Sequence, residues 1–399
     1  MSSAAPSRGR AAARVDLFTE SVIREMTRLS DEHGAINLAQ GFPDFDAPEA
    51  VKDAARRAIA EGINQYPVTW GAPRFRAAIA SKYLRFGWPE VDPETEIVVT
   101  CGSTEAMAAS FLALIEPGAE VLLFEPFYEN YGPDAYLAGG VPKVLPLDPP
   151  DWRLDLDRLA DAIGPRTRAI VLTTPHNPTG RVFDQRELSG IAAAAIENDL
   201  LVFTDEIYEH ILYDGRCHRS IALLDGMWER TVTISALSKT YSVTGWRVGW
   251  AVAASPLMAS IRKVHDFLTV AAPAPLQEAG VVALELPSEY YESLAMEYQE
   301  RRDTFLELAA GPGLEMTKPE GAYYAMAWIG PLRERLGLPD DVAFCQQLVL
   351  RAGVAAVPGS SFFVDPAAGR DLIRFAFPKR LETLRAAAAR LASFAEAAE

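Results

Sequence analysis

Short β-branched runs that stop at polar or glycine-rich turns recur along this chain, and a helical stretch follows each of them. Five such runs cover residues 96–100, 120–124, 168–173, 200–204 and 230–234. Near-continuous apolar strands that alternate with helices are typical of a mainly parallel sheet with helices on both faces. The pattern therefore predicts an α/β fold with its ligand site at the carboxyl ends of the strands.

The same pattern predicts how the chain divides into domains. The five runs and their helices fall within residues 50–285, which we expect to form a large ligand-binding domain. Residues 286–399 would form a smaller α+β domain, joined by the N-terminal arm, residues 1–49. The Ala-, Arg- and Leu-rich stretch 381–398 is expected to be an amphipathic helix of the smaller domain.

Composition excludes several classes of partner. The formal net charge is -16, and such an acidic surface repels nucleic acid and anionic membranes. No apolar run reaches the roughly 18 residues that a membrane helix needs. The cysteines form no CxxC pair and the histidines show no metal-ligand spacing, so we expect neither a disulfide framework nor a metal site. A cytoplasmic protein fits, with roughly the first 15 residues disordered.

Polar residues follow each run and indicate chemistry. The turn Gly102-Ser103-Thr104 precedes a helix expected to begin near Glu105. Such a turn can bind an anion through free N–H groups, although ordinary helix capping uses the same residues. Neither a GxGxxG nor a GxxxxGK[ST] motif is present, so dinucleotide and nucleoside-triphosphate sites lose support.

Lys239 is the one lysine expected at the end of a buried strand. Burying a lysine is costly unless it is neutralised or paired, and burial lowers its pKa, which suits Schiff-base chemistry. A surface lysine just beyond the strand is an equally good interpretation of this residue taken alone.

Asp205, Tyr208 and Asn177 follow two further runs. An aspartate can keep a pyridine nitrogen protonated, and a tyrosine can hydrogen-bond a phenolate oxygen, as the ring of pyridoxal phosphate (PLP) requires. Helix capping by Asp205 and a plain Asn-Pro turn at Asn177 are the alternative interpretations.

In order along the chain, these motifs resemble the fold-type I, class I PLP-dependent aminotransferases. The matching stretches are residues 37–44, 64–66, 174–180, 205–208, 238–249 and 373–375. The sequences NLAQGFPDF and YDG are most similar to the kynurenine aminotransferase, glutamine transaminase K and methionine aminotransferase branch. The resemblance implies transfer of an amino group from an L-amino acid to a 2-oxo acid by a ping-pong route.

The resemblance also implies a role for each matching residue. Lys239 would hold PLP as a Schiff base and move the substrate proton, while Asp205 would pair with the pyridine nitrogen. Arg374 would bind the substrate α-carboxylate, aided by Asn177 and Gly41. The remaining implied contacts to PLP are Tyr128, Asn177 and Tyr208 on the ring, and Ser103, Thr104, Arg247 and the Tyr66 of a second subunit on the phosphate. A homodimer is therefore expected.

Four positions depart from the family pattern. Ala236 replaces a phosphate-binding serine of many relatives, so Ser238 or Ser235 would supply that contact. Val270 and Ala271 replace an aromatic residue and a histidine of the kynurenine-type enzymes, which disfavours kynurenine as the substrate. Some aspartate aminotransferases have a lysine where this chain has Thr104, which disfavours a dicarboxylic substrate.

A second enzymatic interpretation stays open. A PLP-dependent C–S β-lyase acting on cysteine conjugates would use the same residues as an aminotransferase. A non-enzymatic PLP-binding regulator is disfavoured, because both Lys239 and Arg374 are present.

Overall fold

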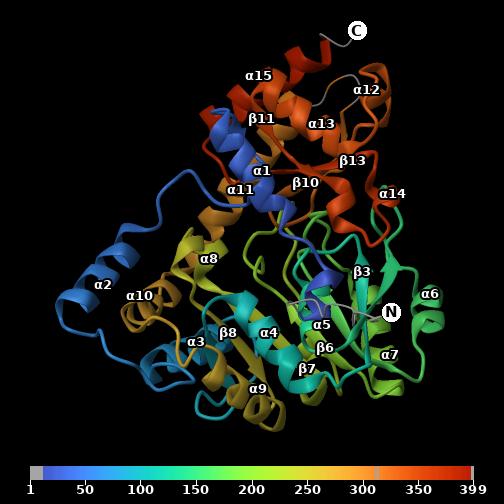
Figure 1. Cartoon of the computed structure of the whole chain (residues 1–399). Helices are drawn as coiled ribbons and strands as arrows, with labels where there is room; N and C mark the ends of the chain where they lie inside the picture. The colour runs from blue at the N-terminus through green and yellow to red at the C-terminus, as the bar shows by residue number, and fades with distance from the viewer. Residues whose placement is uncertain (1–11, 310, 312–313, 397–399) are drawn as a thin grey trace, which may run out of the picture.

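The computed structural model describes residues 12–309, 311 and 314–396. Its largest feature is a seven-stranded sheet with strand order β2-β8-β7-β6-β5-β3-β4. Only β8 runs antiparallel to its neighbours, so the predicted mainly parallel sheet is confirmed. In Figure 1 this sheet and its helices form the lower part of the molecule, while α1 and the C-terminal elements lie together above it.

The five expected runs all become strands of this sheet. Its strands are β2 (Ile97–Thr100), β3 (Glu120–Glu125), β4 (Val141–Pro146), β5 (Thr167–Thr173), β6 (Leu201–Asp205), β7 (Thr231–Ala236) and β8 (Gly249–Ala253). The strands β4 and β8 lie outside the five predicted runs. The edge strand β4 is largely exposed or half-buried and has no continuous apolar run, while β8 is a short strand that begins two residues after Arg247.

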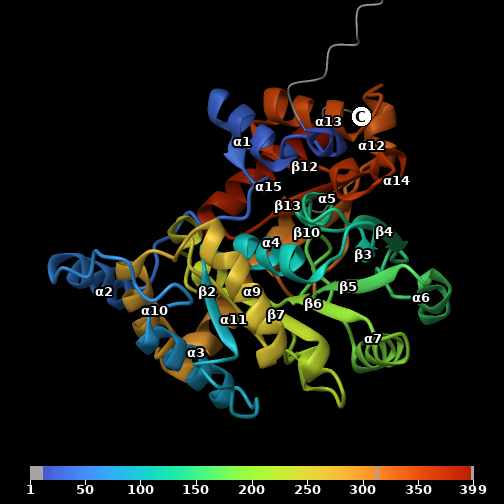
Figure 2. The ribbon, with the colours of Figure 1, turned by 60° about the horizontal axis from the view of Figure 1, so that its bottom comes forward.

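Helices cover both faces of the sheet. The helices of this part of the chain are α2 (Glu49–Ala60), α3 (Pro73–Arg85), α4 (Ser103–Leu114), α5 (Tyr131–Leu137), α6 (Leu156–Ala162), α7 (Gln185–Glu197), α8 (Leu237–Thr240), α9 (Ser255–Leu268) and α10 (Ala274–Leu284). Alternate strand residues point to opposite faces, since Val171 and Phe203 pack with α4 and α9, whereas Ile170 and Val202 pack in the cluster that includes α7. Figures 1 and 2 both place α2, α3 and α10 together at the β2 end of the sheet.

A smaller antiparallel sheet has strand order β12-β13-β10-β9. Its strands are β9 (Glu315–Met316), β10 (Tyr324–Trp328), β12 (Val357–Pro358) and β13 (Leu372–Ala376). The N-terminal segment joins this region, because β1 (Ile36–Asn37) pairs with β11 (Val354–Ala355). The helices here are α1 (Val22–Glu32), α11 (Ser288–Ala309), α12 (Gly330–Arg335), α13 (Asp341–Gln347), α14 (Pro366–Gly369) and α15 (Leu381–Glu396).

Both chain ends were the subject of predictions. The helix expected over residues 381–398 is α15, and its last expected residues lie outside the described part. Most of the expected disordered N-terminus also lies outside it. Disorder is the wrong prediction for residues 13–15, which belong to the short 3-10 helix η1 (Ala13–Leu17). Among the helices of the described residues, none combines the length and the apolar character needed to cross a membrane.

Candidate active site

A cavity of about 420 Å³ lies where the large sheet ends and the smaller sheet begins, and elements of both line it. The predicted site residues that line it are Gly41, Ser103, Thr104, Tyr128, Asn177, Asp205, Tyr208, Ser238, Lys239, Arg247 and Arg374. Several follow the carboxyl ends of parallel strands, as the sequence pattern predicts. Tyr66 is the predicted site residue that does not line the cavity, and it is 84% exposed.

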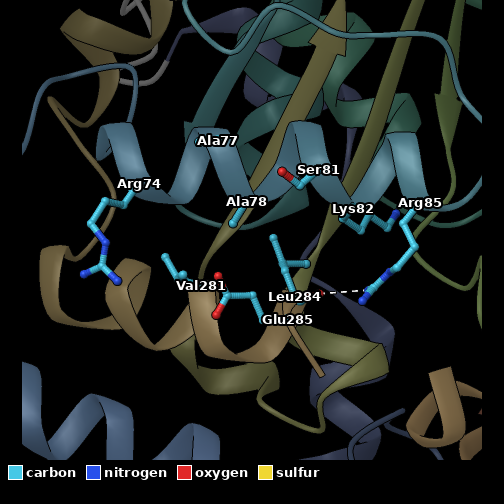
Figure 3. Close-up of a pocket in the computed structure, with 9 residues that line it drawn as sticks. All are labelled: Arg74, Ala77, Ala78, Ser81, Lys82, Arg85, Val281, Leu284 and Glu285. Atoms are coloured by element: carbon cyan, nitrogen blue, oxygen red, sulfur yellow. Dashed lines mark hydrogen bonds between the residues drawn. The ribbon is translucent and has the colours of Figure 1, made fainter. Parts of the chain in front are cut away.

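A second cavity, of about 340 Å³, lies between α3 and α10 and has a different character (Figure 3). Its cationic residues already have protein partners. Arg85 donates to the carbonyl oxygen of Leu284 at 2.8 Å, Arg74 pairs with Glu278 at 2.6 Å, and Lys82 pairs with a buried glutamate. We therefore assign the chemistry to the first cavity.

Lys239 reaches this first cavity from α8, a single helical turn that starts directly after β7. Its Nζ donates to the carbonyl oxygen of Gly41 at 3.3 Å, and that oxygen also accepts from the hydroxyl of Tyr323 at 2.8 Å. Burial lowers the pKa of the Lys239 amine. A side chain at position 41 would collide with Tyr324, because a Cβ there would lie 2.5 Å from its Oη.

Asp205 ends β6 and is buried at the base of the cavity. Its carboxylate accepts hydrogen bonds from the hydroxyl of Tyr131 at 2.8 Å and from the backbone N–H of Ile207 at 3.2 Å. Burial raises the pKa of Asp205 to about 6, against the lowering effect of these two hydrogen bonds. A cation beside Asp205 would favour its ionised form, so the site suits a protonated ring nitrogen.

Two tyrosines share a hydrogen bond on another wall. The hydroxyl oxygens of Tyr208, in the turn after β6, and Tyr324, in β10 of the smaller sheet, lie 2.8 Å apart. Burial raises the pKa of Tyr208 well above its usual value, so its hydroxyl is protonated and can donate.

An anion-binding end is formed by the first turn of α4 together with Arg247. Gly102 precedes the helix with φ 83°, and Ser103 and Thr104 are its first two residues. The helix begins at Ser103, two residues earlier than expected. The guanidinium of Arg247 donates to Thr104 at 3.4 Å and fills the space beside Gly102, where a Cβ would lie 2.5 Å from Nη2. Free N–H groups, hydroxyls and a guanidinium suit a phosphate.

The structure distinguishes the two serines, Ser235 and Ser238, that could replace the serine missing at position 236. Ser235 donates to Glu209 at 2.9 Å and does not line the cavity, whereas Ser238 does. Ala236 is buried between them. This arrangement favours Ser238 as the contact that replaces the missing serine.

Arg374, in β13, is a buried cation at the opposite end. Its Nη1 donates to the side-chain oxygen of Asn177 and its Nη2 to the carbonyl oxygen of Ala39, each at 2.8 Å. The guanidinium also lies over the Tyr324 ring, 4.2 Å from its centroid. Its Nε is fully buried and has no hydrogen-bond partner among the described residues.

Sequence reasoning missed several residues of the cavity. Tyr131 and Tyr324 contact predicted site residues, and Ser21, Arg24 and Glu129 line the cavity from α1, its N-cap and the loop before α5. A signal for Tyr131 existed, because it follows shortly after β3, as Tyr128 does. Glu129 lies in the same segment after β3, whereas Ser21, Arg24 and Tyr324 come from segments without a strand-end motif.

Comparison with known proteins identifies the family. The family model described as aminotransferase class I and II matches residues 33–391. A probable N-succinyldiaminopimelate aminotransferase of Mycobacterium tuberculosis is 42% identical, covering 96% of this chain and 98% of the relative. Methionine aminotransferase of Escherichia coli is 38% identical over 93% of this chain and 95% of its own, and mouse kynurenine–oxoglutarate transaminase 1 is 36% identical over 93% and 94%.

Solved structures agree with these sequence relatives. The structure of the N-succinyldiaminopimelate aminotransferase from Mycobacterium tuberculosis superposes with a TM-score of 0.92 at 40% identity. The match covers 96% of this chain and 100% of that chain. These findings confirm the fold-type I architecture, the predicted branch and the use of PLP, and they favour amino transfer over the C–S lyase alternative. The chain therefore belongs to the class I and II aminotransferases, and it is a PLP-dependent enzyme that transfers amino groups.

Proposed function

We propose that this enzyme moves the amino group of an L-amino acid to a 2-oxo acid in two half-reactions, with Lys239 as the residue that binds PLP covalently. One observation carries the proposal. Lys239, Asp205 and Arg374 come from distant parts of the sequence and line a single cavity. An amine, an acid and a carboxylate-binding cation are the groups that amino transfer with PLP requires.

The cavity offers matching groups to each part of PLP. Asp205 is the partner for the ring nitrogen, and Asn177 and Tyr208 are the partners for the ring hydroxyl. Tyr128 offers an aromatic face to the ring, and it already contacts Tyr131 with ring centroids 5.7 Å apart. When bound, PLP supplies an electron sink that weakens the bonds at the substrate Cα.

The phosphate fits the anion-binding end of the cavity. The first turn of α4 presents N–H groups and the positive end of the helix dipole, and Arg247 supplies a full charge beside it. The chain is acidic overall, with a formal net charge of -16, so this local positive end is needed to attract an anionic cofactor. We assign Ser103, Thr104, Ser238 and Arg247 to the phosphate.

The substrate α-carboxylate is assigned to Arg374. The two hydrogen bonds from its Nη atoms to Asn177 and Ala39 hold the guanidinium plane in place. The free Nε, with the Nη beside it, can form a bidentate pair with a carboxylate. The backbone at Gly41 closes this end of the cavity.

Lys239 is assigned two tasks, covalent binding of PLP and transfer of the substrate Cα proton. Both require the neutral amine, and burial favours that form by lowering the pKa. The contact with the Gly41 carbonyl holds Nζ inside the cavity, between the proposed ring site and the proposed carboxylate site. We propose that the same neutral amine serves both half-reactions.

We further propose that the enzyme is a homodimer in which Tyr66 reaches the phosphate of the partner subunit. Tyr66 is 84% exposed and Phe267 is 91% exposed, unusually high values for large aromatic residues. Val68, Leu268 and Val270 extend this exposed apolar set along the same two segments. We propose that a second copy of the chain covers this exposed apolar set. Tyr66 is the one predicted site residue that does not line the cavity of its own subunit, so it is free to reach the cavity of the partner.

Two predicted features remain part of this proposal. We propose that residues 50–285 form the large PLP-binding domain, while residues 286–399 and the arm 1–49 form the smaller one. We also propose a cytoplasmic location, which the free Cys101, Cys217 and Cys345 favour.

Labelling of Lys239 tests the central assignment. Borohydride reduction of the PLP-loaded enzyme should leave the phosphopyridoxyl mass on the peptide that contains Lys239, and Lys239→Arg should abolish it. Lys379→Arg is a matched control, because Lys379 is also buried and burial lowers its pKa to about 8, yet it does not line the cavity. A label on another lysine would contradict the proposal.

The reaction itself is tested by half-reactions. An amino acid alone should convert the bound cofactor stoichiometrically to its aminated form, and a 2-oxo acid should reverse this. Methionine, glutamine, aromatic and branched amino donors should be tested first. Acidic donors should be included after them, because Arg24 and Glu129 place both a positive and a negative charge at the cavity wall. Pyruvate and ammonia from a β-substituted donor, without any half-reaction, would support the lyase instead.

A further inference from the structure

A buried histidine behind the anion-binding turn joins three segments of the chain. His265, in α9, lies 2.6 Å through Nδ1 from Glu105 in the first turn of α4. Its Nε2 lies 2.8 Å from the carbonyl oxygen of Thr69. The hydroxyl of Thr269 donates to the same Glu105 oxygen at 2.7 Å. We call Thr69, Glu105, His265 and Thr269 the His265 cluster.

The geometry fixes the charge of His265. A carboxylate oxygen and a carbonyl oxygen can only accept hydrogen bonds, so each ring nitrogen must carry a proton and the ring is an imidazolium. Burial lowers the pKa of His265, but the hydrogen bond and the charge of Glu105 outweigh it and the net direction is upward. Burial likewise raises the pKa of Glu105, and His265 reverses this to a net lowering.

The cluster holds the proposed phosphate-binding turn from behind. Glu105 directly follows Thr104, and its second carboxylate oxygen accepts the backbone N–H of Cys101, on the other side of Gly102. An uncompensated carboxylate at this place would repel a phosphate bound at the same turn. The positive charge of His265 removes that repulsion.

The cluster also holds the two segments that carry the exposed apolar set. Thr69 follows Tyr66 by three residues, and His265 precedes Phe267 by two. The contact between His265 and the Thr69 carbonyl therefore fixes the Tyr66 segment against the Phe267 segment. Gln277, in α10, holds the chain just after Thr69, because it accepts from the N–H of Ala72 at 2.7 Å.

We propose that His265 and Glu105 are positioning residues that couple cofactor affinity to subunit association. The pair connects the phosphate-binding turn to the two interface segments. Ordering the turn therefore also orders the two segments, and ordering the segments also orders the turn. The inference rests on the proposed function, in that the turn binds the PLP phosphate and the segments meet a second copy of this chain.

Two substitutions distinguish the effect of the Glu105 charge from the effect of the contact between Glu105 and His265. His265→Gln leaves the Glu105 carboxylate unpaired beside the phosphate, so the dissociation constant for PLP should rise roughly tenfold or more, the size of one charge-assisted hydrogen bond. Glu105→Gln removes that negative charge and should raise the constant only about two- to threefold. The double variant should resemble Glu105→Gln. Both single variants should weaken the dimer measured by sedimentation.

Glu187→Gln is a matched control. Glu187 is also the third residue of a helix and also pairs with a buried cation, Arg181, but its helix α7 contributes no residue to the cavity, whereas α4 contributes Ser103 and Thr104. It should lower thermal stability without changing PLP affinity or dimer dissociation.

The proposal is overturned if His265→Gln binds PLP and dimerises as Glu187→Gln does. It is also overturned if Glu105→Gln weakens PLP binding as much as His265→Gln, because the effect would then be loss of structure rather than of charge compensation. Should His265→Gln fail to fold, Glu105→Gln still decides, since unchanged dimer dissociation contradicts the coupling. Failure of the proposed function is distinguishable, because the wild type itself would then lack the PLP label on Lys239.

Discussion

Arg374 combines full burial with an unused donor, and this makes its shape as important as its charge. Its two Nη atoms are committed to Asn177 and Ala39, and its Nε is free among the described residues. A lysine would keep the charge but could neither hold these contacts nor form a fork. Arg374→Lys should therefore raise KM for the amino acid by roughly tenfold to a hundredfold, the size of one or two charge-assisted hydrogen bonds.

The measurement is a half-reaction titration with the best donor from the screen, alongside a PLP titration of the apoenzyme. PLP affinity should stay within about twofold of wild type, because Arg374 is assigned to the substrate and not to the cofactor. An equal loss of PLP affinity would place Arg374 at the cofactor instead.

At the scale of single residues, the sequence predicts best where a residue follows a recognisable strand. Lys239 and Asp205 were placed in this way, and both line the cavity. Tyr131 and Tyr324 were missed, although they contact Asp205 and Tyr208, because those partners lie 74 and 116 positions away in sequence. The contact of Tyr324 depends on how the smaller sheet meets the turn after β6, and no local pattern encodes this. Tyr131 closely follows β3, so its position alone could have indicated it.

At the scale of elements, most strands of the large sheet were predictable from their β-branched runs, whereas the exposed edge strand β4 and the short buried strand β8 were not. Strands buried on both faces read as apolar runs, which is why β5 and β6 were foreseen. The exposed edge strand β4 carries no such run. The start of α4 was misplaced by two residues because Glu105, expected to begin the helix, instead reaches back to the N–H of Cys101 from within its first turn.

The α4–α9 ion pair predicts a pH dependence of stability. The raised pKa of His265 means that its contribution is complete below about pH 6.5, its ordinary pKa, and is lost as the pH rises through the folded value. The lowered pKa of Glu105 means that its contribution is present above about pH 4.5 and is lost as the pH falls through the folded value. The charge of Asp266 acts in the same direction on His265.

We therefore expect the thermal midpoint of the wild type to approach that of the His265→Gln/Glu105→Gln variant as the pH is raised from 6 to 9. Differential scanning calorimetry at several pH values measures this gap. The gap between wild type and Glu187→Gln should stay constant, because the pair that this substitution removes contains no histidine. A gap that widens above pH 7 would mean that His265 is neutral in the folded enzyme.

At the scale of the whole molecule, the single chain contains an assembled cavity and an apolar surface that the fold itself does not cover. Phe267 and Tyr66 are the most exposed large residues of that surface, at 91% and 84%. The His265 cluster connects their two segments to the turn at the start of α4, which we propose as the phosphate site. Subunit association and cofactor binding should then stabilise each other, since whatever binds the ordered form favours it.

Phe267→Glu tests this view of the assembly. A glutamate at the proposed interface would have to lose its hydration without a partner, so the dimer dissociation constant should rise at least roughly tenfold. PLP occupancy should fall in parallel when the enzyme is diluted. Met296→Glu adds the same charge at another exposed apolar residue, 66% exposed on α11, and should change neither quantity. Tyr66→Phe removes only a hydroxyl, so it should weaken PLP binding while the dimer persists. If Phe267→Glu stayed dimeric and fully loaded at high dilution, the exposed aromatic residues would serve another purpose, and the partner subunit would contribute nothing through them to the cofactor site.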